Sequence, residues 1–284
     1  MSRVVAADGA PGTERRPDRG GPDTDESTTD EPSEGGGCNV VGGVAFGLDL
    51  LAGDPNLTFI AFVGMALLAG VAARFGYYAA RNRRTDVPAG GNALWEYLLA
   101  VGALASLYAF VGVAEIVTSV RATFKQGLML AVVLLLALAV REVYYNAALS
   151  TGAEGRGEFR GRRALELAFV GVVAVVIFGI GAFGLHPGLL ALQGVGALAF
   201  AGYGFGFGRR QTAAAMVQGT MIDSLLRHLL PVLAFAALVP AVDLATVAGL
   251  PRVVVMHLQV VFAIMTATAL MTATIKLRQN LASL

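Results

Sequence analysis

Long apolar blocks separated by short polar segments make up the chain after residue 56. Seven of these blocks have roughly the 20 residues that a helix needs to cross about 30 Å of hydrocarbon. Lipid offers no partner to an open backbone, and no alternating pattern marks barrel strands, so each block is predicted to be a helix. The sequence therefore predicts an all-α integral membrane protein, a seven-transmembrane-helix bundle. The predicted spans are Leu57–Ala80, Ala93–Ser119, Gln126–Ala148, Ala164–Leu185, Leu189–Phe207, Leu225–Val247 and Arg252–Lys276.

The residues before the first span divide into two parts. Residues 1–37 contain nine acidic and four basic side chains and almost nothing apolar, which predicts a disordered acidic tail. Residues 38–56 are too glycine-rich to cross a bilayer and predict an interfacial segment that ends at Asp54-Pro55. The predicted third part, residues 57–284, is the seven-helix transmembrane domain.

The composition supports membrane insertion and excludes several kinds of site and partner. The chain is 56% hydrophobic and 14% charged, whereas soluble domains carry about 25% charged residues. Its mean hydropathy is +0.66. The single cysteine, Cys38, can form neither an intramolecular disulfide nor a zinc cluster. No segment outside the spans is large enough to form a nucleic-acid-binding domain, so nucleic acid is not an expected partner.

The basic residues that flank the spans are distributed unevenly. Twelve lie on one side and three on the other, and the more basic side of a membrane protein normally faces the cytoplasm. This predicts a multi-pass protein of the cell membrane with its amino terminus outside and its carboxyl terminus in the cytoplasm. The opposite orientation of the tail requires that the first span is lost or that residues 39–53 re-enter the membrane.

One group of ionisable residues lies near the predicted outer ends of the spans. Such residues are expensive in lipid, and each therefore suggests a partner or a function. Two carboxylates and two imidazoles at one depth could bind a divalent metal or pass protons. The alternative is simple hydration at the interface, since no HxxxH or ExxH spacing joins them, and no metal or other cofactor is predicted. The group consists of Glu115, His186, Asp243 and His257.

A second group lies near the predicted inner ends of the spans. It consists of Arg74, Arg141, Glu142 and Tyr145. Because Arg141 and Glu142 are sequence neighbours, they point about 100° apart on a helix and are not expected to face each other. Each is therefore expected to pair with another helix, and Arg74 is the expected partner of Glu142. The alternative is that both arginines extend to the headgroup region.

A run of alternating glycines, AGYGFGFGRR, ends the fifth predicted span. It contains the GYG tripeptide of potassium filters, but the two arginines that follow place it at the inner face, and no G-x-G-x-x-G register is present. Glycines four residues apart offer small-xxx-small contacts on two helix faces, which predicts a close-packing or hinge element. These glycines are Gly202, Gly204, Gly206 and Gly208.

The sixth and seventh predicted spans carry residues that alter helix geometry and polarity. Pro231 and Pro240 are both able to kink the sixth span. Threonines in the seventh span either bond to carbonyls of their own helix or line a polar path. These threonines are Thr266, Thr268, Thr272 and Thr274.

The sequence favours neither a rhodopsin-type chromophore nor a haem, and it lacks common enzyme motifs. The topology matches microbial rhodopsins, but the seventh span has no central lysine, since Lys276 lies at its inner end. His186 and His257 do not lie at mid-membrane, where a pair of haem ligands would be expected. Metalloprotease and serine-hydrolase motifs are absent. An intramembrane enzyme that uses Glu115, Asp243 and His257 stays open, although a non-enzymatic protein is favoured.

These features favour a transport-related membrane component, either permease-like or channel-like. The interpretation rests on the glycine-rich spans, the proline-kinked sixth span and the threonines of the seventh. The alternative is a non-enzymatic membrane sensor or scaffold whose acidic tail and inner arginine-rich loops contact partners. Expected partners are the lipid bilayer and either further copies of the chain or a partner membrane or cytoplasmic subunit.

Overall fold

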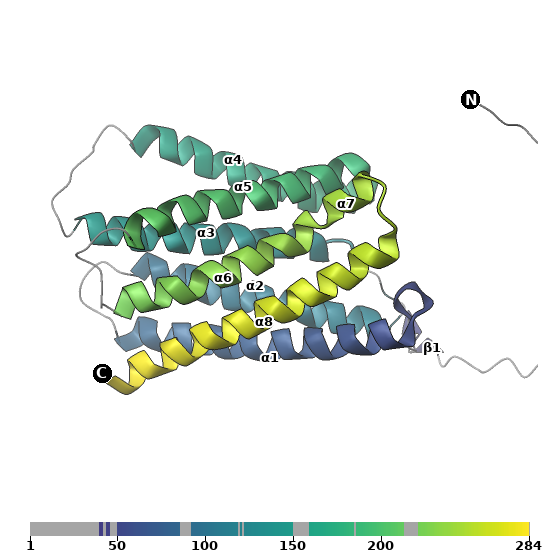
Figure 1. Cartoon of the computed structure of the whole chain (residues 1–284), viewed down its shortest axis with the longest axis horizontal. Helices are drawn as coiled ribbons and strands as arrows, with labels where there is room; N and C mark the ends of the chain where they lie inside the picture. Colours follow the sequence, from purple (N-terminus) through teal and green to yellow (C-terminus); the bar gives the residue numbers. More distant parts are fainter. Residues whose placement is uncertain are drawn as a thin grey trace, which may run out of the picture. The chain divides into compact units, whose positions relative to one another are not determined.

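Seven long apolar helices form the described part of the chain, and the predicted all-α seven-helix bundle is confirmed. The structure, a computed structural model, describes residues 40–41, 44–45, 50–85, 92–118, 120, 122–149, 159–184, 186–212 and 221–283. The sixth span is built from two consecutive helices, α6 and α7 (Figure 1). The helices are α1 Pro55–Thr85, α2 Asn92–Val117, α3 Lys125–Leu149, α4 Phe159–Phe183, α5 Pro187–Thr212, α6 Met221–Ala241, α7 Asp243–Val247 and α8 Arg252–Ser283.

The start of α1 is determined by Asp54 and Pro55. Asp54 Oδ1 accepts hydrogen bonds from the backbone N–H groups of Asn56 at 2.8 Å and Leu57 at 3.2 Å. An aspartate that caps a helix, followed by proline at the first helical position, is a common helix start, because proline has no N–H group to leave unbonded. The residues before it form the short antiparallel strands β1 Val40–Val41 and β2 Val44–Ala45 and the 3₁₀ turn η1 Leu51–Gly53. The predicted tail, residues 1–37, lies outside the described residues.

The contacts between helices give their order around the bundle. Five helices form a closed ring in which α1 packs on α2, α2 on α3, α3 on α6, α6 on α8 and α8 on α1. α5 lies against α3 and α6, and α4 lies against α3 and α5. α1 and α3, which both carry predicted inner-site residues, are therefore separated by α2.

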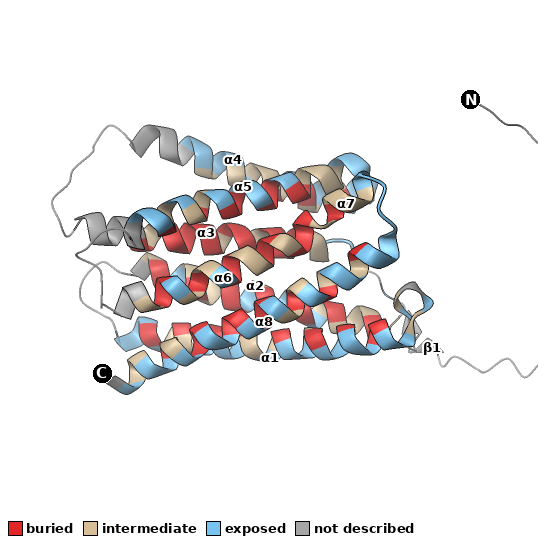
Figure 2. Ribbon diagram, viewed as in Figure 1, coloured by how far each residue is buried: buried red, intermediate tan, exposed pale blue. Residues whose placement is uncertain are grey.

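The helix α3 is the most buried helix, and α4 is the least. In the most apolar window of α3, 72% of residues are buried, compared with 17% in that of α4. Figure 2 shows the same contrast, with red along α3 and blue along much of α4. Large side chains such as Phe178 and Phe183 are exposed on α4. In a membrane, lipid would therefore cover most of α4, while α3 holds its neighbours together.

A close backbone contact joins α1 to α2. A Cβ atom added to Gly102 would lie 2.6 Å from both the Cα and the N atom of Gly76, which is too close for any side chain. Glycine at position 102 thus lets the two helix backbones approach, as small residues do at membrane helix interfaces. α1 is also tied to α8, because Asn82 donates to the Leu277 carbonyl at 3.2 Å and accepts from Asn280 at 2.6 Å.

We expect that Gly102→Ala lowers the free energy of unfolding by about 1–3 kcal/mol, because backbone atoms cannot move aside as a flexible side chain can. Gly206→Ala is the matched control, since no atom of another described element lies within 4 Å of a Cβ at that position. It should leave stability unchanged or raise it by up to about 1 kcal/mol through helix propensity. Thermal unfolding of the two purified variants in detergent, followed by circular dichroism, measures the difference. Equal melting temperatures would contradict the close contact between α1 and α2.

Candidate functional site around Asp243

The sixth span is interrupted next to Asp243. The helix α6 runs through Pro231 and ends at Ala241, one residue after Pro240, and α7 starts at Asp243 after a turn at Val242. Proline has no N–H group to donate to the carbonyl four residues earlier, so a helix is easily interrupted near it. The span predicted as one helix, residues 225–247, is therefore two helices with a carboxylate at the junction.

Asp243 is a buried carboxylate held by two amide side chains. It is 7% exposed. Its Oδ1 accepts a hydrogen bond from Gln259 Nε2 of α8 at 2.8 Å, and its Oδ2 accepts one from Gln193 Nε2 of α5 at 3.4 Å. Three spans thus converge on one side chain, through groups that carry no charge.

The packing of α5 against α7 explains why Gln193 reaches Asp243. The next residue on α5 is Gly194, where an added Cβ would lie 2.5 Å from Leu244 Cγ. Leu244, the neighbour of Asp243, can therefore pack directly on the α5 backbone because Gly194 has no side chain. The contact between Gly194 of α5 and Leu244 of α7 thus brings the neighbouring residues Gln193 and Asp243 within hydrogen-bond distance.

The site is rich in hydrogen-bond acceptors. Gln193 is 2% exposed, and its Oε1 has no hydrogen-bond partner among the described residues. The Val239 carbonyl lies 3.5 Å from Gln259 Nε2, which also donates to Asp243. A carboxylate, an amide oxygen and a backbone carbonyl near a helix break are the oxygen ligands that monovalent cations and protons use in membrane proteins.

The predicted outer residues are not gathered at one site. Glu115 pairs with Lys125 Nζ, and its Oε1 accepts the Ala122 N–H at 2.8 Å, so it closes the connection between α2 and α3. His186 and His257 are both exposed, and each contacts its own segment through Nδ1. Among the described residues, no three His, Cys, Asp or Glu side chains come together as metal ligands. Asp243 is thus the one predicted outer residue in the site described here.

Tyr108 of α2 lies near Lys125 of the Glu115–Lys125 pair. It is buried, at 5% exposure, and Lys125 Nζ lies 5.8 Å from its ring centroid. Tyr108 thus packs beside the ion pair that closes the connection between α2 and α3.

The predicted inner residues form a different cluster from the one expected. Arg141, which is 8% exposed, pairs with Glu166 of α4 and also lies with its Nη2 3.5 Å from Glu142 Oε2. The expectation that Arg141 and Glu142 do not face each other is therefore wrong. Their Cα–Cβ bonds diverge, but the long arginine side chain bends back to its neighbour.

Arg74 is placed away from this cluster. It is exposed on α1, which is separated from α3 by α2, so the expected pair of Arg74 with Glu142 is also wrong. An exposed arginine on a membrane helix extends its stem along the helix until the guanidinium reaches the headgroups. The side chain of Tyr145 lies outside the described residues.

The glycine run of α5 uses one of its two faces within the chain. A Cβ at Gly204 would lie 2.6 Å from Leu233 Cδ2, and one at Gly208 would lie 2.7 Å from Leu230 Cδ2. In the part of the chain that the structure describes, no atom of another element lies within 4 Å of a Cβ added at Gly202 or Gly206. The helix continues without interruption to Thr212, so the run packs α5 on α6 along one face.

The threonines of α8 are satisfied within their own helix. Each hydroxyl donates to a carbonyl three or four residues earlier, at distances from 2.6 to 2.9 Å. Such bonds make threonine inexpensive in lipid. Of the two interpretations of these residues, bonding to their own helix is therefore the one that the contacts support. The residues are Thr266, Thr268, Thr272 and Thr274.

Three residues of these two clusters were not identified from the sequence. Gln193 and Gln259 are uncharged, yet they are the amides that contact Asp243. Glu166 lies at the start of the fourth predicted span, where a carboxylate is expected to be hydrated. A search for any amide within an apolar span would have found both glutamines, because an amide in lipid also requires partners.

Comparisons with known proteins give no family for this chain. No protein-family model matches it, and neither a curated protein nor a solved structure does so. Span count alone does not imply a function, because one architecture serves many functions. The function is therefore argued from the side-chain arrangement around Asp243.

The pairing of Arg141 with Glu166 predicts a large stability effect for a small substitution. Glu166→Gln removes one charge and leaves the buried guanidinium with less compensation, which should lower the free energy of unfolding by about 1–3 kcal/mol. The matched control is Glu96→Gln, because Glu96 pairs with Arg83 at 3.1 Å on the surface, with both side chains about half exposed. It should change stability by less than about 1 kcal/mol.

Both Glu→Gln variants can be compared by unfolding in increasing denaturing detergent, with helix content as the signal. If Glu166→Gln unfolds at the same detergent fraction as Glu96→Gln, the Arg141 cluster contributes no more than a surface ion pair.

Proposed function

We propose that this multi-pass membrane protein is a transport-related component, permease-like or channel-like, in which Asp243 carries a proton or a monovalent cation. The observation that supports the proposal is the buried Asp243 carboxylate, held by the amides of Gln193 and Gln259. An ionisable residue inside a membrane span is expensive to keep and commonly marks a route for ions or protons.

The kind of partner distinguishes Asp243 from the other spanning carboxylates. Glu115 pairs with Lys125, and Glu142 with Arg141, so a nearby cation compensates each charge. Asp243 has no Lys or Arg within salt-bridge distance in the part of the chain that the structure describes. A buried carboxylate without a salt-bridge partner is stabilised by taking up a proton or by binding an external cation.

The interrupted span supports the same function. Helices that break within the membrane expose carbonyl groups, and transporters use such breaks to coordinate the ions that they carry. The junction at Val242 places the Val239 carbonyl and the Asp243 carboxylate near the same glutamine, Gln259. The break also makes α7 a short separate helix, whose Leu244 packs on Gly194 of α5.

Flux in proteoliposomes tests the proposal without knowledge of a co-transported substrate. Purified protein is reconstituted with a pH-sensitive dye inside, a potential is imposed, and proton entry and ²²Na⁺ uptake are both recorded. We expect wild-type vesicles to take up one of the two cations. Asp243→Asn should reduce that uptake to the level of protein-free vesicles, because the amide carries no titratable charge.

Glu96→Gln is the control, since Glu96 lies in an exposed ion pair away from the site. It should keep wild-type uptake, and circular dichroism should show that both variants are equally helical. Wild-type uptake by Asp243→Asn, or no uptake of either cation by wild-type vesicles, would contradict the proposal.

A further inference from the structure

We propose that the species taken up at Asp243 is a proton and not a metal cation, and that Gln193 is a positioning residue that bonds the carboxyl group in both of its protonation states. The inference rests on the proposed function, since it names what the same site receives. Gln193 Nε2 donates to Asp243 Oδ2 when the carboxylate is charged. When Oδ2 is protonated, the amide turns over and its Oε1 accepts the new O–H group.

The second role of Gln193 follows from its amide oxygen. The side chain is 2% exposed, and within the described ranges no donor reaches Oε1. A buried amide oxygen without a donor is costly. A rotation about the Cγ–Cδ bond exchanges Oε1 with Nε2, which already contacts Asp243, and the two ends of an amide are nearly alike in size. A proton on Asp243 Oδ2 thus supplies the donor that Oε1 lacks, with little change in packing.

Gln259, in contrast, is held in one orientation. Its Nε2 lies 2.8 Å from Asp243 Oδ1 and 3.5 Å from the Val239 carbonyl oxygen, and both of these atoms are acceptors. If this amide turned over, its oxygen would face two other oxygens. Gln259 therefore donates to Asp243 in both protonation states. Gln193, whose bond to Asp243 is longer at 3.4 Å, is the amide that can turn.

The same geometry disfavours a metal cation at Asp243. A metal cation is held by several oxygen atoms at once. Each oxygen of the Asp243 carboxylate instead meets an amide NH₂ group, whose hydrogens would repel a cation. Turning Gln193 would add one oxygen, but Gln259 would still present its NH₂ group. A proton needs only one acceptor, and Gln193 Oε1 supplies it.

The step is the transfer of one proton from water. The proton binds Asp243 Oδ2, and the carboxylate becomes a neutral carboxylic acid. The N–H···O bond from Gln193 is replaced by an O–H···O bond to Gln193, so the carboxyl group keeps two hydrogen bonds in each state. Exposed residues of the connection between α7 and α8 begin at Val247, four residues after Asp243. This connection is therefore the side from which water delivers the proton.

The other charged and titratable groups at this end of the bundle differ from Asp243 in exposure or in partners. α7 packs on α5, α6 and α8. His186, Arg252 and His257, which precede α5 or lie at the start of α8, are all exposed. On α2 and α3, Tyr108, Glu115 and Lys125 form their own cluster. Arg252 keeps its charge while a carboxyl group titrates, so its effect on Asp243 is constant.

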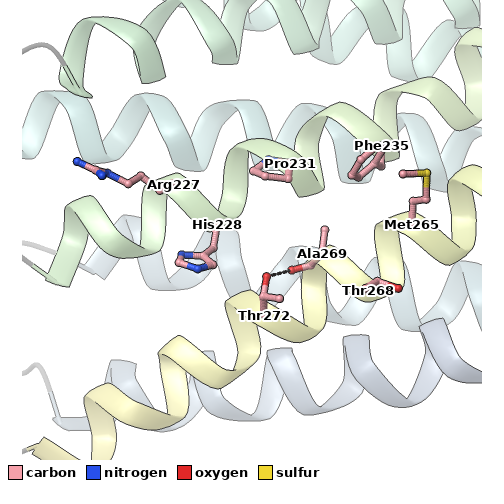
Figure 3. Close-up of a pocket in the computed structure, with 8 residues that line it drawn as sticks. All are labelled: Arg227, His228, Pro231, Phe235, Met265, Thr268, Ala269 and Thr272. Carbon is pink, nitrogen blue, oxygen red and sulfur yellow. Dashed lines mark hydrogen bonds between the residues drawn. The ribbon is translucent and has the colours of Figure 1, made fainter.

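The titratable groups of α6 closest in sequence to Asp243 belong to another part of the helix. Arg227 and His228 line a pocket between α6 and α8 (Figure 3). His228 precedes Asp243 by fifteen residues, or about 22 Å of helix. Thr272, which lines the same pocket, donates its hydroxyl to the Ala269 carbonyl at 2.6 Å. The pocket and its histidine are thus separate from the proton site.

Infrared spectroscopy of the protein in vesicles tests the inference without requiring flux. The C=O stretch of protonated carboxyl groups is recorded as the pH is lowered, and the Asp243 band is the one that Asp243→Asn lacks. We expect this band to appear with a single pH midpoint. Replacing choline by sodium or potassium in the buffer should leave the midpoint unchanged, because neither ion competes with the proton.

Two glutamine variants should move this midpoint in opposite directions. Methionine is also unbranched but lacks a strong donor or acceptor. Gln193→Met removes the acceptor of the protonated form and only a long bond to the charged form, so the midpoint should fall by about half to one pH unit, the value of one hydrogen bond. Gln259→Met removes the short bond to the charged form and should raise the midpoint. Gln279→Met is the control, because Gln279 is exposed on α8, and it should leave the midpoint unchanged.

Three results would overturn the inference. The first is competition by sodium or potassium for the Asp243 band, which would assign the site to a metal cation. The second is the absence of protonated Asp243 at every pH at which the protein stays helical. The third is a higher midpoint in Gln193→Met, or in Gln193→Leu if the methionine variant does not fold, since Gln193 would then act only as a donor. The expected titration in vesicles that show no proton entry would support this inference and contradict the proposed function alone.

Discussion

Hydrocarbon offers no hydrogen-bond partner, and the arrangement of the polar groups in this bundle depends on that constraint. The hydroxyls of the α8 threonines bond to carbonyls of their own helix. Asn82 bonds to a carbonyl and an amide of α8, and thereby joins the first helix to the last. Arg141 at the end of α3 takes two carboxylates, one from its own helix and one from α4. Some polar groups are thus satisfied within one helix, whereas Asn82 and Arg141 also join one helix to another.

The apolar packing decides which polar groups can meet. Gly102 lets α2 approach α1, and Gly194 lets Leu244 of α7 pack against α5. The second contact has a chemical consequence, because it places Asp243 beside Gln193. The closed ring of α1, α2, α3, α6 and α8 in turn leaves α4 at the edge. A few residues without side chains therefore determine the positions of the charged ones.

The sequence was sufficient to predict the seven spans, because an apolar block of about 20 residues has one stable form in lipid. It was not sufficient for the partners of the charged residues, which depend on helix order. Gln193 and Gln259 lie 50 and 16 residues from Asp243 in the chain. Arg74 and Glu142 look complementary in sequence, but α2 separates their helices. The bend of Arg141 back to Glu142 was missed for another reason, since Cα–Cβ directions do not limit a side chain of that length.

Charge compensation distinguishes Asp243 from the other carboxylates described in this bundle. Arg141 meets two carboxylates and Glu115 meets a lysine, so burying them leaves little uncompensated charge. Asp243 meets two amides, and amide hydrogen bonds offset only part of what a carboxylate loses when it leaves water. Asparagine would keep one accepting oxygen, and its NH₂ group could bond the second glutamine only if that glutamine turned its Oε1 toward it. The buried Asp243 carboxylate, bonded to amides only, is therefore the observation on which the proposal of a proton or cation site rests.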